Sequence, residues 1–296
     1  MSFLESGGSR GVLGRAPTAG RVPGRGRTWI RARERKRAGE WLSRLAPIAG
    51  LAVLIAVWQS AVRLARVPAY VVPAPSAVAG ELAANAAFFG HHALVTLGEA
   101  VGGMVLASAA ALAFAAAALH SRFLDRLLTP LVVLSQTIPV IALAPLLVLW
   151  FGYGQMPRVI VCALIAFFPM AVTALEGLRA VDERLLLLLR SVDASRWDVF
   201  WRVRVPGAGP FLAAGARTGL TLSLVGAVVA EWTGTDRGLG YLVLSANARL
   251  ATAQAFAAVA LVSMLGLAFY GTTLLLERRY GWWRRTGGLI ESDGGL

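Results

Sequence analysis

Glu99, Arg217 and Glu231 are among the ionisable side chains that lie inside long apolar runs of the sequence. A charge in the hydrocarbon core of a bilayer is costly, so such residues usually face a partner or a polar path. Glu231 fits either an outer gate or substrate path, or a structural pairing near the membrane interface. For Glu99 and Arg217 we favour structural pairing.

A second group of polar and kinking residues, Gln136, Thr137 and Pro139, interrupts another apolar run. Proline removes a backbone N–H donor, and the carbonyl that this frees is tolerated in lipid only when protein or water satisfies it. These three residues are therefore candidates for lining a translocation path. Packing at a helix kink is the alternative interpretation.

The residue patterns that would support catalysis or metal binding are missing from the sequence. Its one lysine, Lys36, is followed by arginine, whereas a phosphate-binding P-loop needs lysine followed by Ser or Thr. Cys162 is the single cysteine, and the three histidines lack metal-site spacing. We therefore expect no catalytic residue, no metal site and no cofactor bound by this chain.

The composition indicates an all-α membrane protein. Hydrophobic residues make up 57% of the 296 residues and charged residues 15%, whereas soluble domains average roughly 45–50% and about 25%. The net charge is +13. Because the arginines lie in a tail and between apolar runs, we expect contact with a lipid bilayer and no binding of nucleic acid.

Six apolar runs are long enough to span a bilayer, which needs about 20 residues. They lie at about 45–65, 95–119, 128–151, 158–178, 208–232 and 253–276. If successive runs cross the membrane in alternate directions, 23 of the 29 Lys and Arg residues lie on the same side as the two termini. Because Lys and Arg are enriched on the cytoplasmic side, this predicts that both termini are cytoplasmic. We expect a disordered basic tail at 1–43, a membrane domain at 44–285 and a C-terminal cytoplasmic tail at 286–296. Residues 68–92 are expected along the outer surface.

A basic, tryptophan-rich stretch, DERLLLLLRSVDASRWDVFWRVRVP, lies at residues 182–206 between two apolar runs. Residues 183–191 fit a helix with a leucine face, and 192–194 interrupt it. Ser195 and Asp198 then form the S-x-x-[DE] pattern of a capping box, in which each side chain would accept from a backbone N–H group. The stretch therefore predicts two short helices joined by a turn.

The second of these helices should run to about Arg204 and stop at Pro206. Trp197, Phe200 and Trp201 have the spacing of one helix face. The stretch could simply anchor the chain at the membrane interface. Because an anchor needs no capped turn, we favour a docking surface for a soluble partner.

This stretch resembles the EAA loop of permease subunits of bacterial ABC importers, whose form is E-A-A-x3-G-x9-I-x-L-P. Val203, Val205 and Pro206 match its end, and DASRW at 193–197 stands where the family often has G-A-S-R-W. Similarity to the nitrate/sulfonate/taurine branch covers about residues 45–285. It includes VVPAPSAV at 71–78, TIPVIALAPLLVLWFGYG at 137–154, AFFPMAVTALEGLRAVDERLL at 166–186, VVAEW at 228–232 and GLGYLV at 238–243.

The resemblance implies the ABC importer type I permease fold, with six transmembrane helices and a cytoplasmic helix-turn-helix coupling loop. The chain would lie in a bacterial cell membrane as a permease homodimer. Cytoplasmic ABC ATPase subunits, which hydrolyse the ATP, would dock on the loop, and an extracytoplasmic substrate-binding protein would deliver the solute. The coupling residues would be Leu187, Leu189, Asp193, Ala194, Ser195, Arg196, Trp197, Val203 and Pro206.

Three positions depart from the family's pattern. Its Glu-Ala-Ala falls on the leucines at 187–189, its Gly falls on Asp193, and Glu99 stands where relatives often carry Arg. In the family, the Glu and the Gly shape the contact with the ATPase. These departures bear on how strongly the loop would couple the permease to its ATPase.

The resemblance implies import of a small anion such as an aliphatic sulfonate, taurine or nitrate, and Arg217 or helix N-termini would suit an anion path. Related permeases carry pyrimidine precursors, which is the alternative substrate class. An ion-coupled secondary transporter would need inverted repeats and intramembrane carboxylates. The sequence offers only Glu99 and Glu231 as such carboxylates and shows no clear repeat.

Overall fold

The computed structural model describes residues 46, 49–135 and 137–280. The chain divides into two compact units, Met1–Val57 and Trp58–Leu296. In the first unit, the described residues from 49 onward belong to a short apolar helix, Ala49–Leu64. The tails expected at 1–43 and 286–296, and the candidate path residue Gln136, lie outside the described residues.

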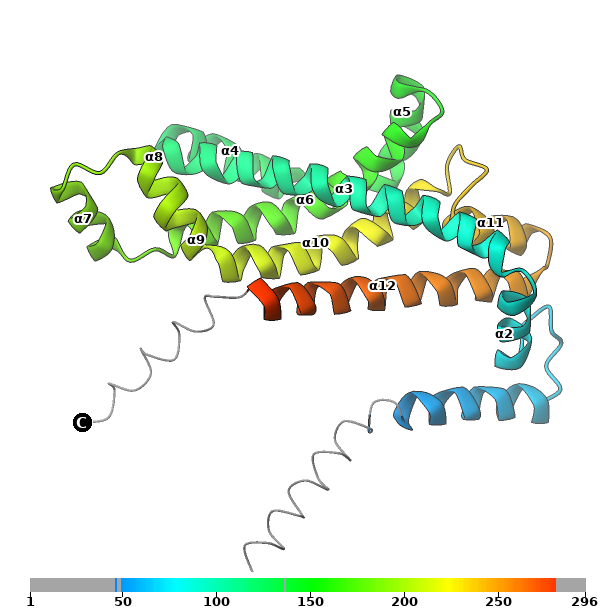
Figure 1. Ribbon diagram of the computed structural model, residues 1–296. Helices are drawn as coiled ribbons and strands as arrows, with labels where there is room; N and C mark the ends of the chain where they lie inside the picture. The colour runs from blue at the N-terminus through cyan, green and yellow to red at the C-terminus, as the bar shows by residue number, and fades with distance from the viewer. Residues whose placement is uncertain (1–45, 47–48, 136, 281–296) are drawn as a thin grey trace, which may run out of the picture. The chain divides into compact units, whose positions relative to one another are not determined.

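The described part of the second unit consists of helices joined by turns (Figure 1). In chain order these are α2 (Pro75–Ala84), α3 (Ala86–His120), α4 (Arg122–Ser135), α5 (Val140–Phe151), α6 (Gln155–Arg179), α7 (Glu183–Ser191), α8 (Arg196–Val199), the π-helix η1 (Phe200–Arg204), α9 (Val205–Gly207), α10 (Gly209–Ala230), α11 (Leu239–Ala248) and α12 (Thr252–Tyr280).

Four of these helices are long and apolar enough to cross a membrane: α3, α6, α10 and α12. They correspond to four of the six expected spans, at 95–119, 158–178, 208–232 and 253–276. The expected span at 45–65 corresponds to the shorter helix Ala49–Leu64. The all-helical fold is therefore confirmed, with four long apolar helices in the described chain.

The expected span at 128–151 is not one helix, which corrects the prediction. α4 ends at Ser135, and α5 begins after Pro139, whose backbone is extended at φ −69° and ψ 96°. Proline disfavours helical geometry in the residue before it and supplies no N–H group. Pro130 and Pro145 lie inside α4 and α5 without ending them, so hydropathy and proline content alone did not locate the break.

The segment at 68–92 also differs from the expected surface segment. Pro75 opens α2, as its fixed φ allows at a first helical position. The residues from Ala86 onward already belong to α3, which starts nine residues before the expected span. Asn85 separates the two helices. No proline or glycine stands at 86–89 to delay α3.

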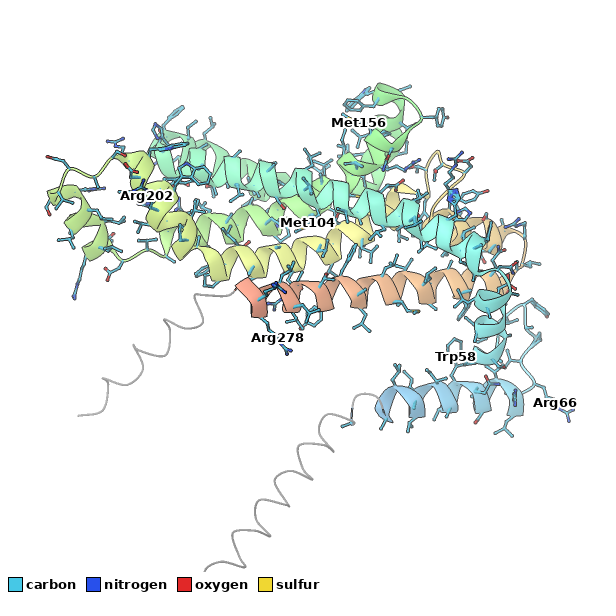
Figure 2. The ribbon with its side chains drawn as sticks, viewed as in Figure 1. Trp58, Arg66, Met104, Met156, Arg202 and Arg278 are labelled. Carbon is cyan, nitrogen blue, oxygen red and sulfur yellow. The ribbon has the colours of Figure 1, made fainter. Side chains whose placement is uncertain are left out.

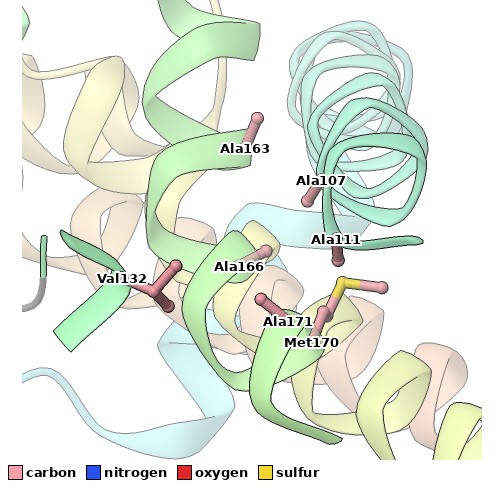
Figure 3. Packing of buried hydrophobic residues seen from close by; sticks show 7 residues of the cluster. All are labelled: Ala107, Ala111, Val132, Ala163, Ala166, Met170 and Ala171. Carbon is pink, nitrogen blue, oxygen red and sulfur yellow. The ribbon is translucent and has the colours of Figure 1, made fainter. Parts of the chain in front are cut away.

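Small residues bring α3, α6 and α10 close together. Ala107 and Ala111 of α3 face the alanine-rich side of α6, and Val132 of α4 joins the same cluster (Figure 3). The other members of the cluster are Ala163, Ala166, Met170 and Ala171. Membrane helices associate through such small side chains because lipid offers no hydrophobic driving force between them.

Of the glycines on α3, Gly103 makes the closest approach to a neighbouring helix. A Cβ at Gly98 would meet nothing nearer than 3.6 Å, and one at Gly102 nothing nearer than 3.3 Å. A Cβ at Gly103 of α3 would overlap the side chain of Cys162 on α6. Gly226 of α10 approaches the backbone of Cys162 from the other side. Cys162 is therefore packed at the junction of the three helices.

Candidate functional site

The elements that carry the candidate functional residues lie at the two ends of the long helices (Figure 1). At one end, residues 183–207 form what we call the helical hairpin, built from α7, α8, η1 and α9. At the other end, a buried polar network surrounds the start of α11. Figure 2 shows Arg202 on the hairpin, Met104 along α3, and Met156 in the first turn of α6, near α5.

The first helix of the hairpin confirms the sequence prediction, because α7 spans Glu183–Ser191. Asp182 caps its start by accepting a hydrogen bond from the Arg184 N–H group at 2.8 Å. At its end, the Ala194 N–H group donates to the Leu189 carbonyl at 3.0 Å, and the Asp193 N–H group donates to the Arg190 carbonyl at 3.2 Å. This pair of bonds is a Schellman motif with Asp193 at the C′ position.

Asp193 has a left-handed backbone, with φ of 52°. The C′ position of a Schellman motif usually holds glycine, because other residues strain in that region. The glycine of the family pattern would therefore adopt this left-handed backbone without strain, whereas Asp193 adopts it with strain. Aspartate is among the non-glycine residues that tolerate the left-handed region best, so the turn keeps its shape.

We expect Asp193→Gly to stabilise the turn. Relief of left-handed strain is worth about 1 kcal/mol, which corresponds to roughly fivefold slower exchange of the amide hydrogens at residues 190–194. Hydrogen exchange by mass spectrometry measures it, with Asp193→Ala as the control that keeps the strain. Faster exchange in Asp193→Gly than in wild type would contradict the assignment of strain to this residue.

The second helix of the hairpin starts with the predicted cap. The Ser195 hydroxyl oxygen accepts a hydrogen bond from the Asp198 N–H group at 3.0 Å. The reciprocal bond differs from the expectation, because Asp198 Oδ2 accepts from the Ser195 hydroxyl at 2.6 Å and not from its backbone N–H group. The cap itself is confirmed.

Pro206 does not stop the chain's helical path, which corrects a prediction. The hydrogen bonding shifts before it to a π-helical pattern, in which the Val205 N–H group donates to the Phe200 carbonyl. α9 then carries Pro206 in its first turn, where the missing N–H group costs nothing. After Ala208 the chain continues directly into α10.

The hairpin presents an apolar surface. The Trp197 and Trp201 rings are 5.5 Å apart, and Phe200 lies 5.2 Å from Trp201. Trp197 is 70% exposed and Leu187 is 61% exposed. Of the predicted coupling residues, Leu187, Asp193, Ser195, Arg196 and Trp197 are exposed, and Leu189, Ala194, Val203 and Pro206 are half-buried.

Two contacts that the sequence did not indicate fix this end of the molecule. Arg204 donates from Nη1 to the carbonyl of Leu178, the penultimate residue of α6, at 2.8 Å. Arg179 pairs with Asp125 of α4 at 2.6 Å. This hydrogen bond lowers the pKa of Asp125, which keeps the carboxylate charged. The hairpin therefore returns to the end of the helix from which it leaves.

At the opposite end, Glu231 is 1% exposed and holds the start of α11. Its Oε1 accepts from the Thr96 hydroxyl at 2.6 Å, and its Oε2 accepts from the Gly240 N–H group at 2.5 Å. Thr96 Oγ1 in turn accepts from the Leu239 N–H group at 2.9 Å. A carboxylate suits the first turn of a helix, where N–H groups lack partners and the helix dipole is positive.

His92 and Gly238 complete this network. The Gly238 N–H group donates to His92 Nδ1 at 3.0 Å. Gly238 has φ of 105°, and a Cβ there would overlap the Glu231 carboxylate. The geometry describes a clamp between α3, α10 and α11, so Glu231 has the surroundings of a structural residue. Its assignment to the translocation path stays a prediction.

Thr96→Val should weaken the clamp. The change preserves shape but leaves the Leu239 N–H group and Glu231 Oε1 without the hydroxyl, which costs about 2–3 kcal/mol of unfolding free energy. Thermal unfolding of the purified chain measures the loss. Thr96→Ser keeps the hydroxyl and should unfold near the wild-type temperature. Equal stability of both variants would exclude a stabilising role for this hydroxyl.

Structural pairing of Glu99 and Arg217 is confirmed. Glu99 is fully buried and its Oε1 lies 2.5 Å from Nε of Arg158 on α6. Arg217 of α10 pairs with Glu277 of α12. Neither Arg158 nor Glu277 was expected from the sequence as the partner of these residues. The sequence did contain one indication of these pairs, because a charge buried among helices needs a partner of opposite charge.

The remaining path candidates lie at the break between α4 and α5. Thr137 is exposed and donates from Oγ1 to the Leu134 carbonyl at 2.8 Å. Pro139 is exposed at the N-cap of α5. Among the described residues, no group of three or more His, Cys, Asp or Glu side chains is placed to hold a metal ion.

Long apolar helices, paired charges between them and a short amphipathic hairpin at one end define a multi-pass α-helical membrane protein. Residues 103–282 match the family described as "Binding-protein-dependent transport system inner membrane component". The match covers more than half of the chain, and the protein belongs to this family.

Curated relatives agree with the family. The chain is 37% identical to a probable ABC transporter permease protein of Haemophilus influenzae, over 80% of this chain and 97% of that one. It is 37% identical to a riboflavin transport system permease protein of Chloroflexus aurantiacus, over 81% and 90%. It is 30% identical to a putative aliphatic sulfonates transport permease protein of Bacillus subtilis, over 92% and 98%.

A solved structure shows the same fold. A crystal structure of an amino acid ABC transporter with histidines matches with a TM-score of 0.57 and 15% identity, over 67% of this chain and 96% of that one. The protein is therefore an inner-membrane permease subunit of an ABC importer and not an enzyme. Membership of a binding-protein-dependent system implies an ATPase and a binding protein as partners, and no cofactor is expected in this subunit.

Proposed function

We propose that the helical hairpin is the surface through which a cytoplasmic ATPase drives this permease. The observation that supports the proposal is that the hairpin exposes apolar side chains and is also bonded to α6. Trp197 and Leu187 are exposed, while Arg204 ties its end to α6. A rigidly tethered surface transmits force to α6 and α10, which a loose membrane anchor does not. In this arrangement both termini are cytoplasmic and α11 faces outward.

The proposed path runs past the described non-helical residues 137–139, between α4 and α5. Non-helical backbone at membrane depth is tolerated where it is buried in protein or lines a water-filled cavity. Transporters place substrate sites at such discontinuous helices. Thr137 and Pro139 would line the path, and a second copy of the chain would close it. The apolar residues exposed on α5, Leu149 and Trp150 among them, are compatible with such a homodimer.

Two substrate classes compete within this proposal. A small anion such as an aliphatic sulfonate, taurine or nitrate has the support of relatives named for aliphatic sulfonates and taurine, at 30% and 31% identity. A heterocycle such as a pyrimidine precursor has the support of relatives named for riboflavin and formylaminopyrimidine, at 37% and 31%. Arg217 is already paired with Glu277, so it does not offer an anion a free charge. We therefore place the heterocycle first.

A ligand screen on the partner binding protein tests this order. Riboflavin, a formylaminopyrimidine, taurine, an alkanesulfonate and nitrate are titrated by calorimetry, and the bound compound is then followed into vesicles containing the assembled transporter. Uptake of a heterocycle supports the order given above. Uptake of taurine, an alkanesulfonate or nitrate alone would reverse it and leave the permease assignment intact.

A further inference from the structure

A cavity of about 1090 Å³ lies between the helical hairpin and the last turns of α3. Four basic side chains line it: His120, Arg190, Arg196 and Arg204. Leu119 and Phe200 contribute an apolar wall. The lining is therefore amphipathic, because it combines guanidinium groups with apolar side chains.

Within the described chain, the basic side chains that line this cavity outnumber the acidic ones. Arg190 and Arg196 form no ion pair with any described residue, and Arg204 is bound to a neutral carbonyl. Asp193 is the acidic residue in the lining. Burial, and then the nearby charge of Arg190, lower the pKa of Arg204. The negative charge of an anion in the cavity would oppose both effects, because it favours the protonated guanidinium.

We propose that this cavity binds the phosphate group of an anionic phospholipid from the adjacent leaflet. Guanidinium groups match phosphate oxygens with paired, charge-assisted hydrogen bonds, so Arg190 and Arg204 would hold the phosphate. Leu119 and Phe200 would contact the glycerol and the upper acyl chains. A soluble phosphate has the same charge but no apolar part, so it would leave this wall uncovered.

The lipid would bridge α7, η1 and the end of α3. Its removal should loosen the hairpin relative to the long helices without changing either element internally. The inference goes beyond the proposed coupling role and does not depend on it, because lipid binding is measured on the permease chain alone.

Native mass spectrometry of the purified full-length chain tests the proposal. The chain in detergent is titrated with phosphatidylglycerol, with phosphatidylcholine and with inorganic phosphate. We expect saturable binding of phosphatidylglycerol, weaker binding of phosphatidylcholine and no competition by millimolar inorganic phosphate. Equal binding of the two lipids would overturn the proposal, and so would displacement of phosphatidylglycerol by inorganic phosphate.

Variants of one arginine locate the site. Arg190→Gln should raise the Kd for phosphatidylglycerol about fivefold, as expected for one basic residue beside an anionic headgroup. Arg190→Lys keeps the charge and should stay within about twofold of wild type. Arg184→Gln is the matched control, because Arg184 lies on the same helix but not in the cavity lining. Equal Kd values for Arg190→Gln and Arg184→Gln, with unchanged melting temperatures, would exclude this cavity.

Discussion

Ala194→Glu should reduce the substrate-stimulated ATPase activity of the assembled transporter at least tenfold, to its basal rate. Ala194 is half-buried at the turn between α7 and α8, and its N–H group closes the Schellman motif. A glutamate there puts a negative charge next to the C-terminal end of α7, where the helix dipole is already negative. It also adds bulk at the proposed contact with the ATPase. ATP hydrolysis with and without loaded binding protein measures the effect.

Ala194→Ser is the matched control for this experiment. It keeps a small residue and adds no charge, so stimulation should stay near wild type. Membrane insertion should be the same for both variants, because the hairpin lies outside the four long apolar helices. If Ala194→Glu kept wild-type stimulation of ATP hydrolysis, the assignment of the hairpin turn to the coupling surface would be wrong.

Gly238→Ala should be the most damaging single substitution near α11. Any side chain at φ of 105° is strained, and here the Cβ would also overlap the Glu231 carboxylate. Displacement of that carboxylate would leave a buried charge without its donors from Thr96 and Gly240. We expect a loss of more than about 3 kcal/mol of unfolding free energy, or roughly 6–12 °C in apparent Tm.

Gly90→Ala serves as the control for the clamp. Gly90 lies in the first turns of α3, and a Cβ there would meet nothing within 4 Å. This variant should be neutral or more stable by about 0.5–1 kcal/mol, because alanine favours helix. Thermal unfolding by intrinsic fluorescence compares the two variants. Equal melting temperatures would show that the Glu231 network does not stabilise the fold.

The hairpin was the part of the structure most fully predicted from sequence, because its signals are local. A leucine face, an interruption and a serine cap lie within a few residues of one another, and α7 and the Ser195 cap follow them. Pro206 was misjudged because proline ends a helix only when the helix cannot change its hydrogen-bond pattern. The π-helix before Pro206 makes that change.

Contacts between residues far apart in the chain could not be predicted from the sequence. Hydropathy marks a span by its mean and cannot place a break, so α4 and α5 were merged. The partners of Glu231, namely Thr96 and the Gly240 amide, are 135 and 9 residues away in the chain. Pairing of Glu99 with Arg158 likewise depends on how α3 meets α6. The sequence indicates that a buried charge needs a partner, and the fold alone identifies it.

Transport into sealed vesicles tests the central claim, that this chain is the permease of an ATP-driven importer. The permease, its ATPase and its loaded binding protein are reconstituted, and uptake of the labelled solute is measured with internal or external ATP and with imposed ion gradients. Uptake should require ATP on the ATPase side and should persist when the gradients are collapsed. Uptake driven by an ion gradient in the absence of ATP would contradict the account.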